Sequence, residues 1–179
     1  MQGLKNPESE EFVASHLLEP KLIIATEKDI PLIAGMAARI WPVHYTPIIG
    51  SAQVDYMLKK LYSESSLREQ FHKGQNFFLI MNDGKPIGYI AVEGDGKQFF
   101  MHKFYMEVEE QGKGYGKKIF NELLKLFPQL NTIELQVNRR NIKTVNFYFR
   151  VGFVIKEAKD FDIGGGYFMK DYVMIYRKK

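Results

Sequence analysis

The sequence predicts an α/β (α+β) protein whose central sheet is mixed, mostly antiparallel and flanked by helices. Three observations carry this prediction. Apolar residues recur at helical spacing over residues 27–73 and alternate at strand spacing from residue 75 onward. Glycine turns at 83–84 and 94–96 divide residues 75–108 into three strands. After residue 108 helical and strand segments alternate, which predicts a βαβ crossover and about seven strands in all.

The first half is predicted to hold one strand and three helices. Residues 21–26, KLIIAT, read as a strand, and residues 27–41 read as a helix with Thr26 as N-cap and Asp29 three positions on. Residues 51–63 form an amphipathic helix because Val54, Met57, Leu58 and Leu61 share one face. A short helix at 66–74 ends at Gly74.

The second half is predicted to alternate between the two kinds of element. A helix runs from about residue 114 to 127 and stops at Pro128, and residues 131–137 form a strand. A further helix at 141–152 ends at Gly152. Two strands, 153–161 and 167–178, follow, and the loop DIGGG at 162–166 joins them.

The composition fits one compact domain of a soluble protein. The chain has 179 residues and a formal net charge of +4, which is too mild to indicate nucleic-acid binding. It contains no cysteine, so disulfides, thiolate metal sites and a cysteine nucleophile are excluded, and we expect no metal. We expect no membrane span, since no apolar run approaches about 18 residues. Residues 1–20 read as a polar leader without a signal-peptide core, residues 21–179 as the single domain, and the expected location is cytoplasmic.

The segment QGKGYG, residues 111–116, predicts an anion site at the start of a helix. Gly112, Gly114 and Gly116 let the backbone approach a ligand, and the free N–H groups of the next helix attract phosphate. The spacing does not fit a P-loop or a dinucleotide fingerprint, although Glu134 lies at a suitable distance for a ribose contact. A loop whose glycines only permit a tight turn is the remaining alternative.

Two blocks of the sequence together resemble the GNAT superfamily of acetyl-CoA-dependent N-acetyltransferases. The first is FYMEVEEQGKGYGKKIFNELL, in which Gln111, Gly114 and Gly116 match the family pattern and Val108 stands where a proline is common. The second is LQVNRRNIKTVNFYFRVGF, whose matching positions are Asn141, Phe147, Tyr148, Gly152 and Phe153. The resemblance implies the family fold over residues 21–179, with a βαβ unit that binds acetyl-CoA, and it implies an enzyme.

The resemblance also implies roles for single residues. The end of the strand before the loop would hold the acetyl and pantetheine portion, Asn141 would contact the cofactor, and Tyr148 would act as general acid. The pyrophosphate would lie against the loop. The implied cofactor-binding residues are Phe104, Tyr105, Met106, Gln111, Gly112, Lys113, Gly114, Tyr115, Gly116, Lys117 and Asn141.

The chemistry of acyl transfer agrees with these roles. A strand N–H near Met106 is suited to stabilise the oxyanion, and the protonated phenol of Tyr148 is suited to donate to the departing sulfur. Taken alone, Tyr148 also reads as an aromatic core residue.

The base is less defined. Gln136 stands where some relatives have a glutamate and cannot accept the proton, whereas Glu134 lies on the same strand face. Glu93, Glu107, His102 and a chain of waters are the alternatives, and each side chain also reads as a solvated surface group.

The acceptor side is expected to come from the early helices and the last hairpin. Trp41, His44 and Tyr45 can form an aromatic wall or simply pack at a helix end. Asp160 and Asp162 can attract a cationic amine or belong to a polar hairpin loop. The last segments look like the branch that includes bacterial spermidine/spermine acetyltransferases, which implies a polyamine-like small amine, with a peptide amine still open.

Two further classes remain open at this point. One is a non-catalytic acyl-CoA-binding sensor with the same fold, and the other is a nucleic-acid-binding module. The resemblance to the family also implies a homodimer.

Overall fold

The computed structural model describes residues 19–179. The predicted polar leader at 1–20 therefore lies outside the described residues, except for its last two positions. No helix among residues 19–179 is both long enough and apolar enough to cross a membrane.

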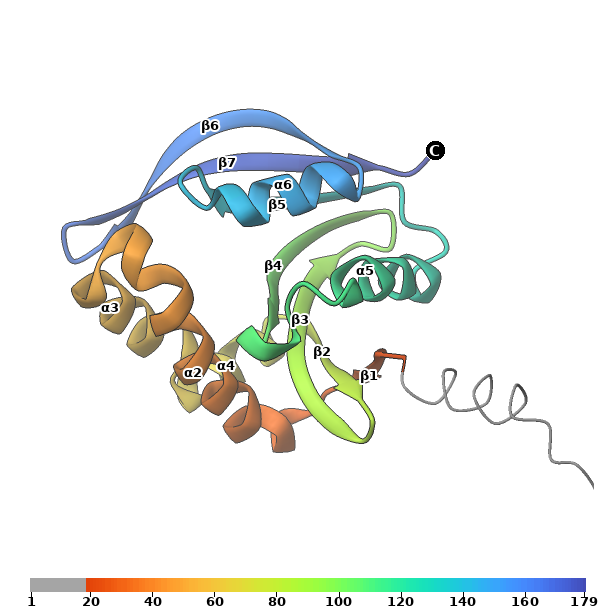
Figure 1. Ribbon diagram of the computed structural model, residues 1–179, viewed down its shortest axis with the longest axis horizontal. Helices are drawn as coiled ribbons and strands as arrows, with labels where there is room; N and C mark the ends of the chain where they lie inside the picture. Colours follow the sequence, from red (N-terminus) through yellow and green to blue (C-terminus); the bar gives the residue numbers. More distant parts are fainter. Residues whose placement is uncertain (1–18) are drawn as a thin grey trace, which may run out of the picture.

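The order of elements matches the prediction, with two added 3-10 turns. Strand, three helices, three strands, helix, strand, helix and two strands follow one another (Figure 1). The helices are α2 (Ile30–Ile49), α3 (Ser51–Tyr62), α4 (Glu64–His72), α5 (Tyr115–Leu126) and α6 (Ile142–Arg150), with the 3-10 turns η1 (Glu27–Asp29) and η2 (Val108–Glu110). The strands are β1 (Lys21–Ile24), β2 (Asn76–Asn82), β3 (Lys85–Gly94), β4 (Gln98–Met106), β5 (Thr132–Asn138), β6 (Phe153–Gly164) and β7 (Tyr167–Arg177).

All seven strands form one sheet in the order β1-β2-β3-β4-β5-β7-β6. Only β4 and β5 pair in parallel, with α5 as the crossover, and every other neighbour is antiparallel. Asp83 and Gly84 adopt φ values of 49° and 71° in the two-residue turn between β2 and β3, as a tight hairpin requires. The predicted mixed, mostly antiparallel α/β class is confirmed.

Helices cover both faces of the sheet and create two cores. The bundle α2–α4 packs on one face around Ile33, Trp41 and Leu67, while α5 and α6 pack on the other around Phe120 and Tyr148 (Figure 1). We call these the bundle face and the crossover face.

Helix α2 is longer than the sequence predicts. It continues past residue 41, through Pro42 and Pro47, to Ile49. A proline inside a helix removes one hydrogen bond and clashes with the preceding turn, which is why the pattern favoured an earlier end. The burial of Tyr45 in the extension offsets part of the free-energy cost of these prolines. The extension carries His44 and Tyr45 over the centre of the sheet.

Strand β4 contains a bulge that the sequence did not reveal. Val92 of β3 lies opposite Met101, but Ala91 lies opposite Lys103, so His102 is an extra residue on β4. A bulge of this kind leaves one residue out of the ladder and bends its strand.

The bulge reverses which side chains of β4 face each core. Phe99 and Met101 before it and Phe104 and Met106 after it all contact the crossover-face core. Pairing between β4 and β5 ends at the same point, with Met101 opposite Leu135, although both strands continue. The two strands therefore separate after the bulge and leave the β5-side edge of β4 free for other partners.

Candidate active site

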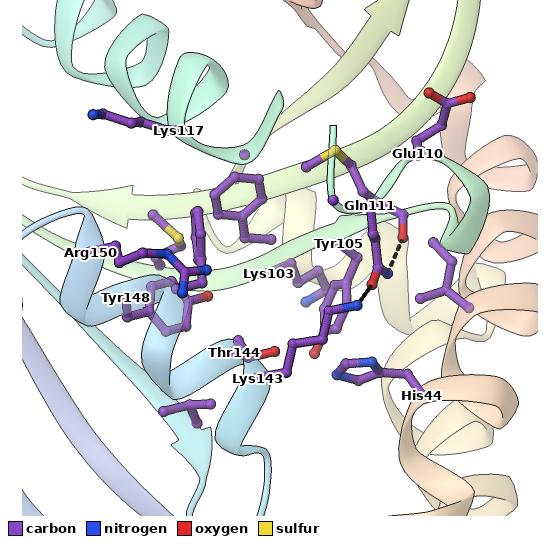
Figure 2. A pocket seen from close by; sticks show the side chains of 18 of the residues that line it. His44, Lys103, Tyr105, Glu110, Gln111, Lys117, Lys143, Thr144, Tyr148 and Arg150 are labelled. Atoms are coloured by element: carbon purple, nitrogen blue, oxygen red, sulfur yellow. Dashed lines mark hydrogen bonds between the residues drawn. The ribbon is translucent and has the colours of Figure 1, made fainter. Parts of the chain in front are cut away.

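A cavity of about 420 Å³ lies where β4 and β5 separate. Its walls come from both faces of the sheet, because α2 contributes from the bundle face and α5 and α6 from the crossover face (Figure 2). The lining residues are Ile40, His44, Tyr45, Met101, His102, Lys103, Phe104, Tyr105, Met106, Glu110, Gln111, Gly112, Gly114, Gly116, Lys117, Gln136, Val137, Lys143, Thr144, Phe147, Tyr148 and Arg150.

The three glycines of the loop serve two different purposes. Gly112 and Gly114 both adopt a φ of 82°, which only glycine takes at little cost. Gly114 is the N-cap of α5, and no side chain caps that helix start, so its first N–H groups remain available to a ligand. Gly116 has no such φ, but a Cβ there would lie 2.9 Å from Cε2 of Phe147. It therefore permits the close approach of α5 to α6.

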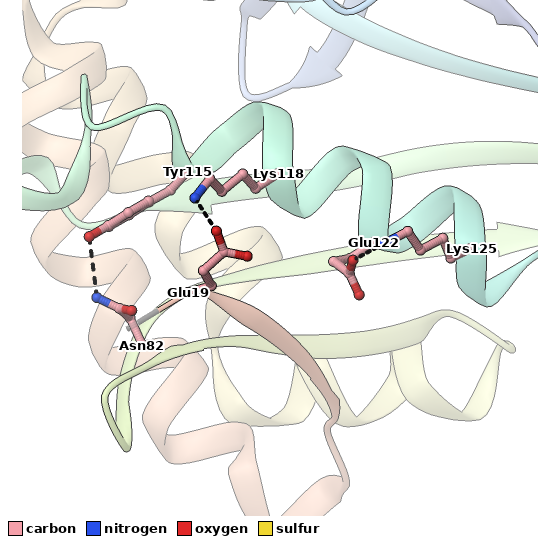
Figure 3. Close-up of polar contacts among 6 residues, drawn as sticks. All are labelled: Glu19, Asn82, Tyr115, Lys118, Glu122 and Lys125. Atoms are coloured by element: carbon pink, nitrogen blue, oxygen red, sulfur yellow. Dashed lines mark hydrogen bonds and ion pairs between the residues drawn. The ribbon is translucent and has the colours of Figure 1, made fainter. Parts of the chain in front are cut away.

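The lysines around the loop point in different directions. Lys117 lines the cavity, whereas the Nζ of Lys113 lies 3.0 Å from a carboxylate oxygen of Glu110. Lys118 points away and binds Glu19 at 2.6 Å, ahead of β1 (Figure 3). The structure thus brings one of these three side chains, Lys117, to the cavity.

Tyr115 is not among the lining residues. Its hydroxyl accepts a long 3.5 Å hydrogen bond from the side-chain amide of Asn82 on β2 (Figure 3). Only its backbone, in the first turn of α5, belongs to the predicted anion site.

Gln111 connects the loop to β4 and to α6. Its Nε2 donates to the Met106 carbonyl at 3.0 Å, and its Oε1 accepts from Lys143 Nζ at 2.9 Å (Figure 2). Lys143 and Arg150 both line the cavity and were missed in the sequence. They lie seven positions apart on one face of α6, five before and two after Tyr148, and no sequence pattern singled them out because exposed cations on a helix are common.

The predicted residues at the end of β4 all reach the cavity. Phe104, Tyr105 and Met106 are lining residues, and they follow the point where pairing with β5 stops. Main-chain groups on that edge are therefore suited to bind an extended ligand as a strand would.

Tyr148 projects from α6 into the cavity from the crossover face (Figure 2). The residue is 6% exposed and packs against Phe147 and Phe153. Burial raises the pKa of its phenol above the ordinary value, with a smaller contribution from Tyr45. The hydroxyl has no hydrogen-bond partner within the described chain, and it is protonated at neutral pH.

Asn141 does not line the cavity but positions a residue that does. Its Oδ1 caps α6 by accepting from the Thr144 amide at 3.3 Å. Its Nδ2 must then donate to His44 Nε2, 2.8 Å away, so the proton of the neutral ring is on Nδ1. Burial lowers the pKa of His44, and the charge of Lys143 lowers it further.

The predicted acceptor residues separate into two groups. Tyr45 lines the cavity, and its hydroxyl lies 3.2 Å from that of Tyr105. Burial is the main cause that raises the pKa of Tyr45 to about 12. Trp41 is instead buried in the bundle-face core at 3% exposure, and the Asp162 carboxylate binds the Gly164 amide in the hairpin at 2.8 Å.

Glu134 also lies outside the cavity lining. Its carboxylate binds Lys156 of β6 at 2.6 Å, while Gln136, two residues further on β5, does line the cavity. The strand alternation placed Glu134 on the correct face, but the strand separation that opens the cavity begins beyond it. Residues 19–179 hold no group of three or more His, Asp or Glu side chains arranged for a metal ion.

Known proteins are similar to this chain in sequence and in architecture. An uncharacterized N-acetyltransferase of Mycobacterium tuberculosis is 24% identical over 151 residues, which cover 82% of this chain and 96% of that protein. The PaiA N-acetyltransferase of Thermoplasma acidophilum, solved with coenzyme A, is 20% identical, with a TM-score of 0.73. The match covers 90% of this chain and 100% of that protein. The spermidine N-acetyltransferase of Vibrio cholerae, solved with CoA and spermine, is 20% identical, with a TM-score of 0.65. The match covers 89% of this chain and 95% of that protein.

A profile of the acetyltransferase (GNAT) domain matches residues 46–164, which is more than half of the chain. This stretch includes the bulged strand, the glycine loop and the helix that carries Tyr148. The resemblance found in the two sequence blocks is confirmed. This chain belongs to the GNAT acetyltransferase family, and it is an N-acetyltransferase.

Proposed function

We propose that this enzyme transfers the acetyl group of acetyl-CoA to a primary amine of a polyamine-like small molecule or a peptide. The amine attacks the thioester directly, and Tyr148 acts as general acid. One observation carries the proposal: a single cavity joins the glycine loop to Tyr148 and continues to α2 on the other face of the sheet.

The donor side fits the pyrophosphate and pantetheine of acetyl-CoA. The uncapped first turn of α5 offers N–H groups and the positive end of the helix dipole. Lys117, Lys143 and Arg150 add cationic charge around it. The unpaired edge of β4 at Phe104–Met106 is available for the amides of an extended pantetheine arm.

The chain supplies two groups for the chemical step. A main-chain N–H near Met106 stabilises the negative charge that develops on the thioester oxygen during attack. Tyr148 holds a proton that its raised pKa keeps on the phenol, and it donates this proton to the departing sulfur.

The acceptor side is aromatic and lies on the bundle face. Tyr45 and Tyr105 form its wall through their linked hydroxyls, and His44 adds a neutral ring. The likeness to the spermidine enzyme of Vibrio cholerae supports a polyamine, although at 20% identity it supports the fold more than the acceptor. Trp41, Asp162 and Glu134 would act from positions outside the cavity lining.

Two measurements test the proposal. Calorimetry with acetyl-CoA should show one site per chain, and a CoA-release assay over a panel of polyamines, short amines and peptides should show turnover with at least one amine. Binding without release for every amine would favour a non-catalytic sensor, and absence of acetyl-CoA binding would contradict both. A homodimer, a cytoplasmic location and the absence of nucleic-acid binding remain predictions.

A further inference from the structure

The bulge residue His102 forms a hydrogen-bonded pair with Glu93 at the edge of the cavity. Its Nε2 lies 3.0 Å from Oε2 of Glu93, which belongs to the neighbouring strand β3. The His102 side chain is 28% exposed, and the residue is part of the cavity wall at the point where β4 and β5 separate. The proposed reaction so far has an acid but no group that takes the proton of the acceptor ammonium.

We propose that His102, held by Glu93, is the catalytic base that accepts this proton. The inference rests on the proposed function, because it assigns a role within the same reaction. It places the base on the bulge itself, on the other side of the strand opening from Tyr148.

The other titratable groups of the cavity wall do not meet the requirement for a base. His44 has its lone pair engaged by Asn141, and Glu110 is paired with Lys113 beside the loop. The remaining ionisable groups of the lining are lysine, arginine and tyrosine side chains, which serve as proton donors rather than as bases; they are Tyr45, Lys103, Tyr105, Lys117, Lys143, Tyr148 and Arg150. Within the lining, His102 alone offers a free basic nitrogen.

The partner of His102 fixes which nitrogen is free. A carboxylate only accepts hydrogen bonds, so Nε2 of His102 must carry the proton that faces Glu93. The lone pair is then on Nδ1. The ring also packs against Phe100, with centroids 4.8 Å apart, which limits its rotation. A carboxylate that orients an imidazole and stabilises its protonated form is the arrangement of known catalytic dyads and triads.

The charges around His102 keep it neutral but able to accept a proton. Burial lowers its pKa most, Lys103 of β4 lowers it further, and Glu93 raises it in part. On β5, Glu134 lies opposite Phe100 in the strand register, but its charge is paired with Lys156. The imidazole is therefore unprotonated at pH 7, as a base must be.

The proton balance of the step closes with these two residues. The acceptor ammonium loses one proton to Nδ1 of His102, which passes it to solvent. The neutral amine nitrogen then forms a bond to the carbonyl carbon and loses a second proton to the same Nδ1. The carbon–sulfur bond breaks, and the sulfur receives a proton from Tyr148. The protonated imidazole then returns its proton to solvent, and the phenolate regains one, so neither residue is changed after a turnover.

The test compares the pH dependence of kcat/KM for three variants with the best amine of the panel. His102→Gln should lower kcat by about 10²-fold, the lower end of the usual range for a general base, and should remove the acid limb of the profile. Glu93→Gln should keep the limb but move it to lower pH, since the carboxylate that raises the pKa is gone. His72→Gln is the matched control, because His72 pairs with Glu27 at the same 3.0 Å, away from the cavity.

Two further measurements, of acetyl-CoA binding and of the His102 pKa, separate the possible outcomes. Acetyl-CoA binding by calorimetry should be unchanged in all three variants, which separates loss of the base from loss of the fold. The pKa of His102, measured by NMR in the acetyl-CoA complex, should equal that of the acid limb. A His102→Gln enzyme with the acid limb intact and kcat within about twofold of wild type would overturn the dyad but not the proposed function. A wild-type enzyme that releases CoA with no amine would overturn both.

Discussion

At the scale of single residues, Tyr148 combines a buried ring with a free hydroxyl. A core tyrosine usually satisfies its hydroxyl with a protein partner, because a buried polar group without one costs free energy. The Tyr148 hydroxyl faces the cavity instead and has no partner among residues 19–179. This arrangement favours a group that acts on a ligand over a group that only fills the core.

Replacing Tyr148 with phenylalanine should therefore affect catalysis more than binding. Tyr148→Phe keeps the ring and its contacts with Phe147 and Phe153, so acetyl-CoA affinity should stay within about twofold. Turnover should fall by about 10²-fold, the loss expected for one general acid. Steady-state assays and calorimetry on the same preparations measure the two quantities. Unchanged turnover would remove Tyr148 from the mechanism.

Site residues could be predicted from the sequence where the residue type alone restricts the role. Residues that belong to the site only because packing brings them to the cavity could not. Gly114 and Tyr148 could be found because glycine at a helix start and tyrosine in a second block are informative as residue types. Lys143 and Arg150 could not, since exposed cations on a helix are common and only the packing of α6 brings them to the cavity. Glu134 was placed on the correct face, but a period-two pattern does not show where two strands separate.

At the scale of elements, the Asn141 side chain at the start of α6 connects that helix to α2. Asn141 caps the helix through Thr144 and, through the other end of its amide, fixes the ring of His44 on α2. A residue implied by family resemblance to touch the cofactor thus has a structural role that its position in the sequence did not indicate.

Asn141→Ala should lower the free energy of unfolding by about 1 kcal/mol, because α6 loses its cap. Asn141→Asp keeps a capping oxygen and is the matched control, so it should recover most of that loss. Urea unfolding followed by circular dichroism measures both. Equal stability of the alanine variant and wild type would show that the cap contributes nothing measurable.

Most strand bounds and turns could be predicted, but β6 continues to Gly164 instead of ending at residue 161, so the predicted loop at 162–166 is shorter in the structure. The bulge could not be predicted. Asp83-Gly84 and the glycines at 164–166 mark their hairpins through backbone preferences that are local in sequence. The bulge at His102 depends on how β3 and β4 align, which is a relation between two segments rather than a property of one. The end of α2 was predicted wrongly for a similar reason, because the burial of Tyr45 against other elements is not visible in the local preference of the two prolines.

At the scale of the whole molecule, the buried Lys103 makes stability depend on pH. Its Nζ donates to Gln70 of α4 and lies 5.5 Å from the ring centroids of Tyr62 and Phe77. Burial lowers its pKa from 10.5 to about 8. The unfolded chain thus binds more protons between these two values, so stability rises with pH across this window, and the cost of burying the charge is fully present below it.

Lys103→Met should remove this dependence. The wild-type chain should gain about 3 kcal/mol between pH 8 and pH 10.5 from this group, at about 1.4 kcal/mol per pH unit. The variant should lack that gain, and its advantage over wild type should be greatest at pH 7. Urea unfolding at pH 7.5 and pH 10 measures the difference. A constant offset between the two proteins at both pH values would contradict the assignment.

Because the cavity is lined from both faces of the sheet, the proposed function predicts that the two substrates enter from opposite faces and meet in the middle. In that arrangement the acetyl group passes directly from acetyl-CoA to the amine while both are bound, and no product leaves before the second substrate binds. Double-reciprocal plots at several amine concentrations should give intersecting lines, since both substrates occupy the enzyme together. A desulfo analogue of CoA should compete with acetyl-CoA but not with the amine. Parallel lines would indicate an acetylated enzyme and would contradict a cavity that serves both substrates at once.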